Sequence, residues 1–87
     1  MNITKLGYFN VIKELESLKK GWNGYNGKPI KKKILKKFKN MSYVTSVFNK
    51  FKFLGFNEFE IDLTPTNDGG IQFEAEKDGI YLEIEIL

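Results

Sequence analysis

The last third of the chain alternates between apolar and polar residues with a period of two. The alternation runs through three segments, at residues 58–65, 70–77 and 80–87. A period of two places the apolar side chains of a strand on one face and its polar side chains on the other. The pattern therefore predicts three β-strands, each with one buried and one exposed face.

The dipeptide Asp78-Gly79 separates the second and third segments. Asp-Gly between two alternating segments is a strong signal for a two-residue hairpin turn. A hairpin closed there places Phe73 opposite Ile84, and apolar residues then face each other at every inward position. A turn at residues 67–69 joins the first two strands with matching parity. We therefore expect an antiparallel meander whose register is set by its apolar face.

The first two thirds of the chain carry apolar residues at spacings of three and four, the period of an amphipathic helix. A first helix is predicted at about residues 5–20 and a second at about 28–52. Pro29 suits the first turn of the second helix, and the weak helix former Asn40 allows a bend. The expected fold class is α+β, with two helices packed on one face of a three-stranded antiparallel meander in the order ααβββ. We expect a single domain over residues 1–87.

A glycine-rich stretch, Gly-Trp-Asn-Gly-Tyr-Asn-Gly at residues 21–27, joins the predicted helices and holds the single tryptophan. Gly21 stands where a helix commonly ends in a left-handed residue. Trp22 would then fold back and fill the end of the core between the helices and the sheet. We interpret the stretch as a structural corner rather than a binding loop, and we expect Tyr25 to be its exposed contact residue.

The two parts of the chain carry opposite charge. Residues 1–57 hold thirteen lysines and two acidic residues, whereas residues 58–87 hold nine acidic residues and one lysine. The net charge of +3 hides this division. Arginine is absent, and because its planar fork is the preferred donor to phosphate, this absence argues mildly against dedicated nucleic-acid binding.

The composition excludes several kinds of chemistry. The chain has no cysteine and no histidine, which excludes disulfides, thiolate or imidazole metal sites, and catalysis based on either residue. No apolar run approaches the ~20 residues of a membrane span. Charges interrupt the apolar residues at the N-terminus, unlike in a signal peptide. We expect a cytoplasmic protein with no membrane contact, no catalytic residue, no cofactor and no bound metal.

Carboxylates dominate the polar positions of the predicted strands. In the predicted register Glu74 lies opposite both Asp62 and Glu83, and Glu60 lies opposite Glu76. Like charges across an antiparallel pair destabilise it by up to ~1 kcal/mol. This face is either a solvated surface, an interaction surface for a positive partner, or a divalent-metal site that lacks an Asp-x-Asp-x-Asp loop. The predicted partner-binding residues are Glu60, Asp62, Glu74, Glu76, Glu83, Glu85 and Tyr25.

Lysines line the polar side of the second predicted helix. Basic residues on one face, near the aromatic side chains of the corner, are a candidate nucleic-acid surface. The simpler interpretation is an exposed amphipathic helix whose lysine content reflects coding bias. The candidate residues for the nucleic-acid alternative are Lys32, Lys33, Lys36, Lys37 and Lys39.

Two stretches together resemble a group of small, mostly uncharacterised bacterial and phage proteins. One is Gly-Trp-Asn-Gly-Tyr at residues 21–25 with Lys-Pro-Ile at 28–30, and the other is Asp-Gly-Gly-Ile-Gln-Phe-Glu at 68–74. The chain departs from those relatives at Ala75, where they often have a tryptophan. The resemblance implies a bacterial or phage origin and a place among mobile-element or toxin–antitoxin genes.

These observations favour a small non-enzymatic protein-binding module: an inhibitor, an antitoxin or an anti-defence protein. Its acidic sheet face is expected to engage a protein with a basic surface, such as a nucleic-acid-binding toxin or defence protein, because complementary charge speeds encounter and fixes orientation. Two alternatives stay open. One is nucleic-acid binding through the lysine-rich helix, and the other is a homo-oligomer in which the acidic sheet of one copy docks on the lysine-rich helix of another.

Overall fold

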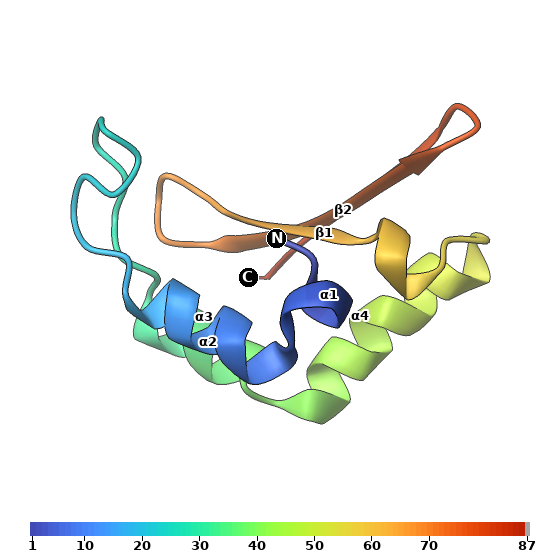
Figure 1. The fold of residues 1–87 in the computed structure, drawn as a ribbon, viewed down its shortest axis with the longest axis horizontal. Helices are drawn as coiled ribbons and strands as arrows, with labels where there is room; N and C mark the ends of the chain where they lie inside the picture. The colour runs from blue at the N-terminus through green and yellow to red at the C-terminus, as the bar shows by residue number, and fades with distance from the viewer. Residues whose placement is uncertain (87) are drawn as a thin grey trace.

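The computed structural model describes residues 1–86, which form four α-helices followed by one three-stranded antiparallel sheet (Figure 1). The helices are α1 (Ile3–Leu6), α2 (Tyr8–Glu16), α3 (Lys32–Phe38) and α4 (Met41–Phe53). A short 3-10 helix, η1 (Glu58–Glu60), precedes the strands β1 (Asp62–Pro65), β2 (Ile71–Lys77) and β3 (Ile80–Ile86). The predicted α+β class and the order of helices before sheet are confirmed, while the number of helices is four rather than two.

The predicted register of the second hairpin is confirmed. Phe73 pairs with Ile84, and the pairing continues without a bulge from the Lys77–Ile80 pair to the Ile71–Ile86 pair. Apolar residues occupy the three buried positions of β2, Ile71, Phe73 and Ala75, so a shift by one residue would turn them all outward. The third strand was predicted to run to residue 87, and this last residue lies outside the described part of the chain.

The first predicted helix is shorter than expected and is broken in two. Gly7 has a φ of +90°, which lies outside the helical region, and it ends α1 and precedes α2. At the other end α2 stops at Glu16 rather than near residue 20. There the Ser17 hydroxyl donates to the carbonyl of Glu14 at 2.6 Å, and the Ser17 amide donates to the same carbonyl at 3.2 Å.

The second predicted helix also divides, at the bend expected near Asn40. The Asn40 side chain accepts hydrogen bonds from the backbone amides of Ser42 and Tyr43, and it thereby caps the start of α4. Residues 28–31 stay outside α3: Lys31 has an extended backbone with ψ of 139°, and the segment contacts the loop of residues 66–70. The amide of Lys28 donates to Asn67, and that of Lys31 donates to Gly69.

The first predicted strand begins later than its alternating pattern indicated. Residues 58–60 form η1 instead, because the Asn57 side chain accepts from the amide of Phe59 while the Glu60 carboxylate accepts from the amide of Asn57. This reciprocal arrangement is a capping box, which stabilises a helical turn. As a result Phe59 is more than half exposed rather than inward, and Glu60 does not face Glu76.

The core lies between the helices and the inner face of the sheet. All four helices lie on one side of the sheet in Figure 1. Phe73 of β2 is fully buried, and its ring contacts those of Phe38 and Phe48 at centroid distances of 6.2 and 6.1 Å. Tyr8 packs on Phe38 and donates its hydroxyl to the carbonyl of that residue. The helices therefore cover one face of the sheet and leave the other to solvent.

Candidate protein-binding surface

The outer face of the sheet collects most of the carboxylates predicted to bind a partner. The register places Asp62 opposite Glu74 and Glu74 opposite Glu83, so three carboxylates form one row across the three strands. Glu76 and Glu85 flank this row on β2 and β3. We call these five residues, Asp62, Glu74, Glu76, Glu83 and Glu85, the acidic face.

Tyr81 lies within the acidic face, and the interpretation of the sequence omitted it. Its hydroxyl lies 2.8 Å from a carboxylate oxygen of Glu83 and 3.0 Å from one of Glu74. The hydroxyl has a single proton and donates to one of them at a time. The hydrogen bond to Glu83, together with desolvation and the bond to Glu74, raises the pKa of the Tyr81 hydroxyl well above its usual range. Its parity with Glu83 on β3 was the available signal, because residues two apart on a strand share a face.

Few cations compensate the acidic face. Within residues 1–86 the three ion pairs are Met1 ammonium with Asp62 at 2.8 Å, Lys77 with Glu60 at 3.4 Å, and Lys39 with Glu16 at 3.1 Å. Of the acidic face, only Asp62 takes part in one of these pairs. The other four carboxylates have no ion-pair partner in this part of the chain.

Glu60 belongs to a different environment from the one predicted. It is part of η1, where its carboxylate accepts a backbone hydrogen bond from Asn57 at 2.9 Å and pairs with Lys77. The backbone hydrogen bond, helped by the charge of Lys77, lowers the pKa of this carboxyl. Glu60 therefore has a structural role in capping η1, and it does not join the acidic face.

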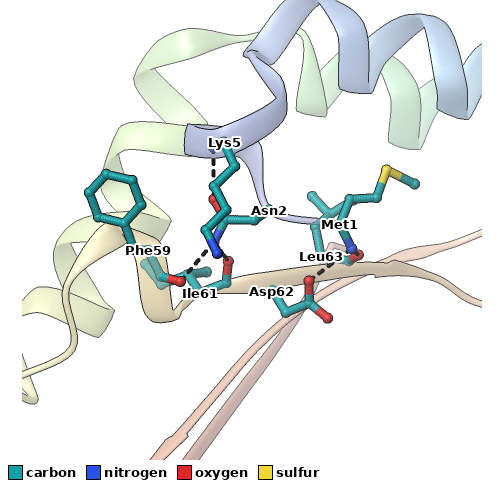
Figure 2. Close-up of polar contacts among 7 residues, drawn as sticks. All are labelled: Met1, Asn2, Lys5, Phe59, Ile61, Asp62 and Leu63. Atoms are coloured by element: carbon teal, nitrogen blue, oxygen red, sulfur yellow. Dashed lines mark hydrogen bonds and ion pairs between the residues drawn. The ribbon is translucent and has the colours of Figure 1, made fainter.

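The N-terminal residues cover the free side of β1 (Figure 2). The amide of Leu63 donates to the carbonyl of Met1, and the Met1 ammonium donates to the carbonyl of Leu63, both at 2.7 Å. The Asn2 side chain donates to the carbonyl of Phe59 at 2.8 Å, which links α1 to η1. Met1 thus acts as a short additional strand beside β1.

The glycine-rich stretch connects α2 to α3, and its Trp22 does not fill the core, contrary to the prediction. The indole of Trp22 is half-buried and donates to the carbonyl of Lys28 at 2.8 Å, while the Asn23 side chain accepts from the amides of Tyr25 and Gly27. Tyr25 is 86% exposed. Figure 1 shows this loop at the opposite end of the molecule from the β2–β3 turn. The loop that holds Tyr25 is therefore far from the end of the acidic face next to that turn.

The lysines of α3 are divided between two surfaces. Lys32, Lys36 and Lys39 line a hollow of about 420 Å³ between α2 and α3. Its remaining lining is Leu15, Glu16, Leu18, Pro29, Ile30 and Leu35. Lys33 lies on the other side, beside Asp68 and Glu85. Lys33 therefore lines a different surface from Lys32, Lys36 and Lys39.

Neither a metal-binding cluster nor a membrane-spanning helix is found among residues 1–86. Among residues 1–86 no cluster of three or more acidic side chains is arranged to hold a metal ion. None of the helices in that range is long and apolar enough to cross a membrane. Comparison of the chain with family models, curated proteins and solved structures found no match.

Proposed function

We propose that this chain is a non-enzymatic, cytosolic protein-binding module whose acidic face engages a basic surface on its partner. An inhibitor, an antitoxin or an anti-defence protein acts in this way, and a nucleic-acid-binding toxin or defence protein offers the matching basic surface. The observation that carries the proposal is the pairing of Glu74 with Glu83 across β2 and β3, with no cation beside either in residues 1–86.

The facing carboxylates oppose the pairing of the strands. Facing carboxylates on neighbouring strands destabilise a sheet by up to ~1 kcal/mol, and the β-branched threonine suits an exposed strand position better than glutamate. The Tyr81 hydroxyl lies between Glu74 and Glu83 but has only one proton to donate. Lysine or arginine side chains of a partner would offset the repulsion and form charge-assisted hydrogen bonds with the carboxylates.

The experiment compares two charge variants in capture from cells that carry the gene. Glu76→Lys with Glu83→Lys changes the acidic face, whereas Glu14→Lys with Glu16→Lys produces the same change in net charge on α2. Circular dichroism checks that both variants are folded. We expect the wild type and the α2 variant to retain the same partner, identified by mass spectrometry, and the acidic-face variant to lose it. Equal capture by all three proteins would refute the proposal.

A nucleic-acid-binding role is the second candidate, and the lysines beside the hollow between α2 and α3 favour it. Lys32 and Lys36 are exposed one helical turn apart on α3. Titration of fluorescent single-stranded and duplex DNA at about 150 mM salt tests this role, because phosphate contacts weaken steeply with salt. We expect weak, salt-sensitive binding, since the acidic face repels phosphate. Tight binding that is lost in Lys32→Glu with Lys36→Glu would place this role first.

Self-association is the third candidate, in which the acidic face of one copy meets the lysines of α3 in another. Such a contact would be heterologous and would build closed rings or open chains. Sedimentation at low and high salt tests it. Concentration-dependent growth that disappears in the acidic-face variant would support it, and a monomer under all conditions would exclude it.

A further inference from the structure

The two edges of the sheet differ in whether another segment pairs with them. The free side of β1 pairs with Met1 through two backbone hydrogen bonds. β3 lies at the other edge, and its only neighbouring strand is β2. In residues 1–86 the backbone of β3 makes no hydrogen bond to the backbone of any element other than β2. This edge is therefore open over most of its length.

β3 lacks several of the devices that prevent edge pairing. Proline, lysine, inward-pointing charges and bulges commonly protect an edge strand. β3 contains no proline or lysine, pairs one-to-one with β2, and carries its two charged side chains, Glu83 and Glu85, on the outer face. Residues that close a two-residue hairpin, here Lys77 and Ile80, form a hydrogen-bonded pair, and antiparallel bonding alternates from there. The backbone groups of Tyr81 and Glu83 are therefore directed away from β2, toward a potential added strand.

An apolar groove runs beside the inner face of this edge. It is a hollow of about 580 Å³ between α4 and β3, lined by Asn49, Lys50, Phe53, Leu54, Leu82 and Ile84. Phe53 is 90% exposed at the end of α4, and Ile80 is 50% exposed at the start of β3. A strand added to β3 would place alternate side chains into this groove and cover these apolar groups.

Charges on the two sides of the edge select the chemistry of such a strand. Glu83 and Glu85 project from the outer face of β3, whereas Lys50 lies on the inner side. Residues directly opposite each other on paired strands share a face. Basic side chains of an added strand are therefore attracted on the outer face and repelled from the inner one.

We propose that β3 is a docking edge for an extended segment of a partner protein in which basic and apolar residues alternate. The segment adds a fourth strand, its basic residues meet Glu83 and Glu85, and its apolar residues enter the groove beside Phe53. This inference rests on the function proposed for the acidic face, and it adds backbone pairing as the mode of binding.

A second copy of the chain fits this edge poorly. Antiparallel pairing of β3 with the β3 of another copy would bring Glu83 and Glu85 of both chains onto one continuous outer face. Like charges on facing strands oppose pairing. A basic segment in the same place turns that repulsion into attraction.

The test uses labelled peptides of defined sequence. The probe is a fluorescent peptide of about seven residues, matched to β3 in length, that alternates lysine with valine. One control has the same composition in scrambled order, and the other carries N-methyl groups on alternate backbone nitrogens, which removes donors but keeps every charge. Anisotropy titrations should show the probe binding about tenfold or more tightly than either control. Amide hydrogen exchange at Tyr81 and Glu83 should slow only with the probe.

Matched protein variants locate the site. Phe53→Ser should weaken binding of the probe, whereas Phe9→Ser, at a side chain 77% exposed on α2, should leave it unchanged. Equal binding of all three peptides, lost in Glu76→Lys with Glu83→Lys, would overturn the docking edge while leaving the proposed function of the acidic face intact. Failure of the probe to bind, or a dimer whose Tyr81 and Glu83 amides are already protected, would also overturn the docking edge. None of these peptide results refutes the proposed function itself, which the capture experiment tests separately.

Discussion

Met1 and Leu63 exchange two backbone hydrogen bonds of 2.7 Å across the free side of β1. The contact holds the segment before α1 against β1, the first strand of the sheet. It also places the Met1 ammonium 2.8 Å from Asp62, the one acidic-face carboxylate that forms an ion pair within residues 1–86. The strand edge that this contact covers is the opposite one from β3, where no such contact occurs in residues 1–86.

Replacing Asn2 should loosen this arrangement. The Asn2 side chain accepts from the amide of Lys5 at 3.0 Å, which caps α1, and donates to the carbonyl of Phe59. Asn2→Ala removes both contacts and should lower the free energy of unfolding by about 1–2 kcal/mol. Urea denaturation measures it. Asn26→Ala in the exposed corner is the control and should change stability by less than about 0.5 kcal/mol; equal effects would contradict the role of Asn2.

Gly69 should be far less replaceable than Gly24, although both have positive φ values of +88° and +80°. A Cβ on Gly69 would lie 2.6 Å from the carbonyl oxygen of Pro29, whereas one on Gly24 would meet nothing within 4 Å. Gly24→Ala should cost about 1–2 kcal/mol from backbone strain alone. Gly69→Ala should cost at least about 3 kcal/mol, because the backbone of Pro29 must also move. Thermal or urea unfolding that ranks the two equally would show that the 66–70 loop is not docked against residue 29.

Removing the Tyr81 hydroxyl should change the alkaline stability of the protein. The hydrogen bond to Glu83 raises the pKa of Tyr81 in the folded state above its ordinary value of 10.0. A raised folded-state pKa stabilises the fold below pH ~10, and this contribution is lost as the pH rises through the folded value. Wild type should therefore lose more stability between about pH 9 and 11 than Tyr81→Phe. Parallel urea curves across that range would contradict the shared hydrogen bonds of Tyr81.

The β-hairpin was predictable because two independent patterns agree on its register. The Asp78-Gly79 turn and the alternation of apolar and polar residues around Phe73 each require Phe73 to pair with Ile84. The structure shows this pairing. The outward position of Glu74 and Glu83 follows directly from that register. Most of the acidic face could therefore be predicted from the sequence. The alternation also predicts that Tyr81 points outward, but it does not predict the contact of Tyr81 with Glu74.

The element boundaries were not predictable in the same way, because local hydrogen bonds override the apolar period. Asn57 and Glu60 cap each other's backbone groups and form η1 where alternation indicated a strand. Gly7 divides a continuous apolar stripe. Lys28 and Lys31 donate their amides to a loop about forty residues away in sequence, and Lys31 has an extended backbone ahead of α3. The spacing of apolar residues does not predict such bonds, because they depend on tertiary contact or on a single side chain.

The orientation of the sheet can be tested with two neighbouring positions on β2. Ala75 is 4% exposed and Glu76 is exposed on the outer face. Ala75→Asp places an unpaired carboxylate in the core and should cost at least about 3 kcal/mol or prevent folding. Glu76→Lys should be neutral or slightly stabilising, because it removes one of several neighbouring negative charges. Greater damage from Glu76→Lys in urea denaturation would mean that the outer face is not the acidic one.

The most direct test of the central claim is the rate at which the captured, purified partner associates with the wild type and with Glu76→Lys plus Glu83→Lys. Stopped-flow measurements from about 50 to 500 mM salt separate electrostatic attraction from other contacts, because salt screens exposed charges. If the acidic face binds the partner, the wild-type association rate falls steeply with salt. The acidic-face variant then associates at least about tenfold more slowly at low salt, and its rate depends little on salt. Equal rates with equal salt dependence in the two folded proteins would show that the acidic face is only a solvated surface.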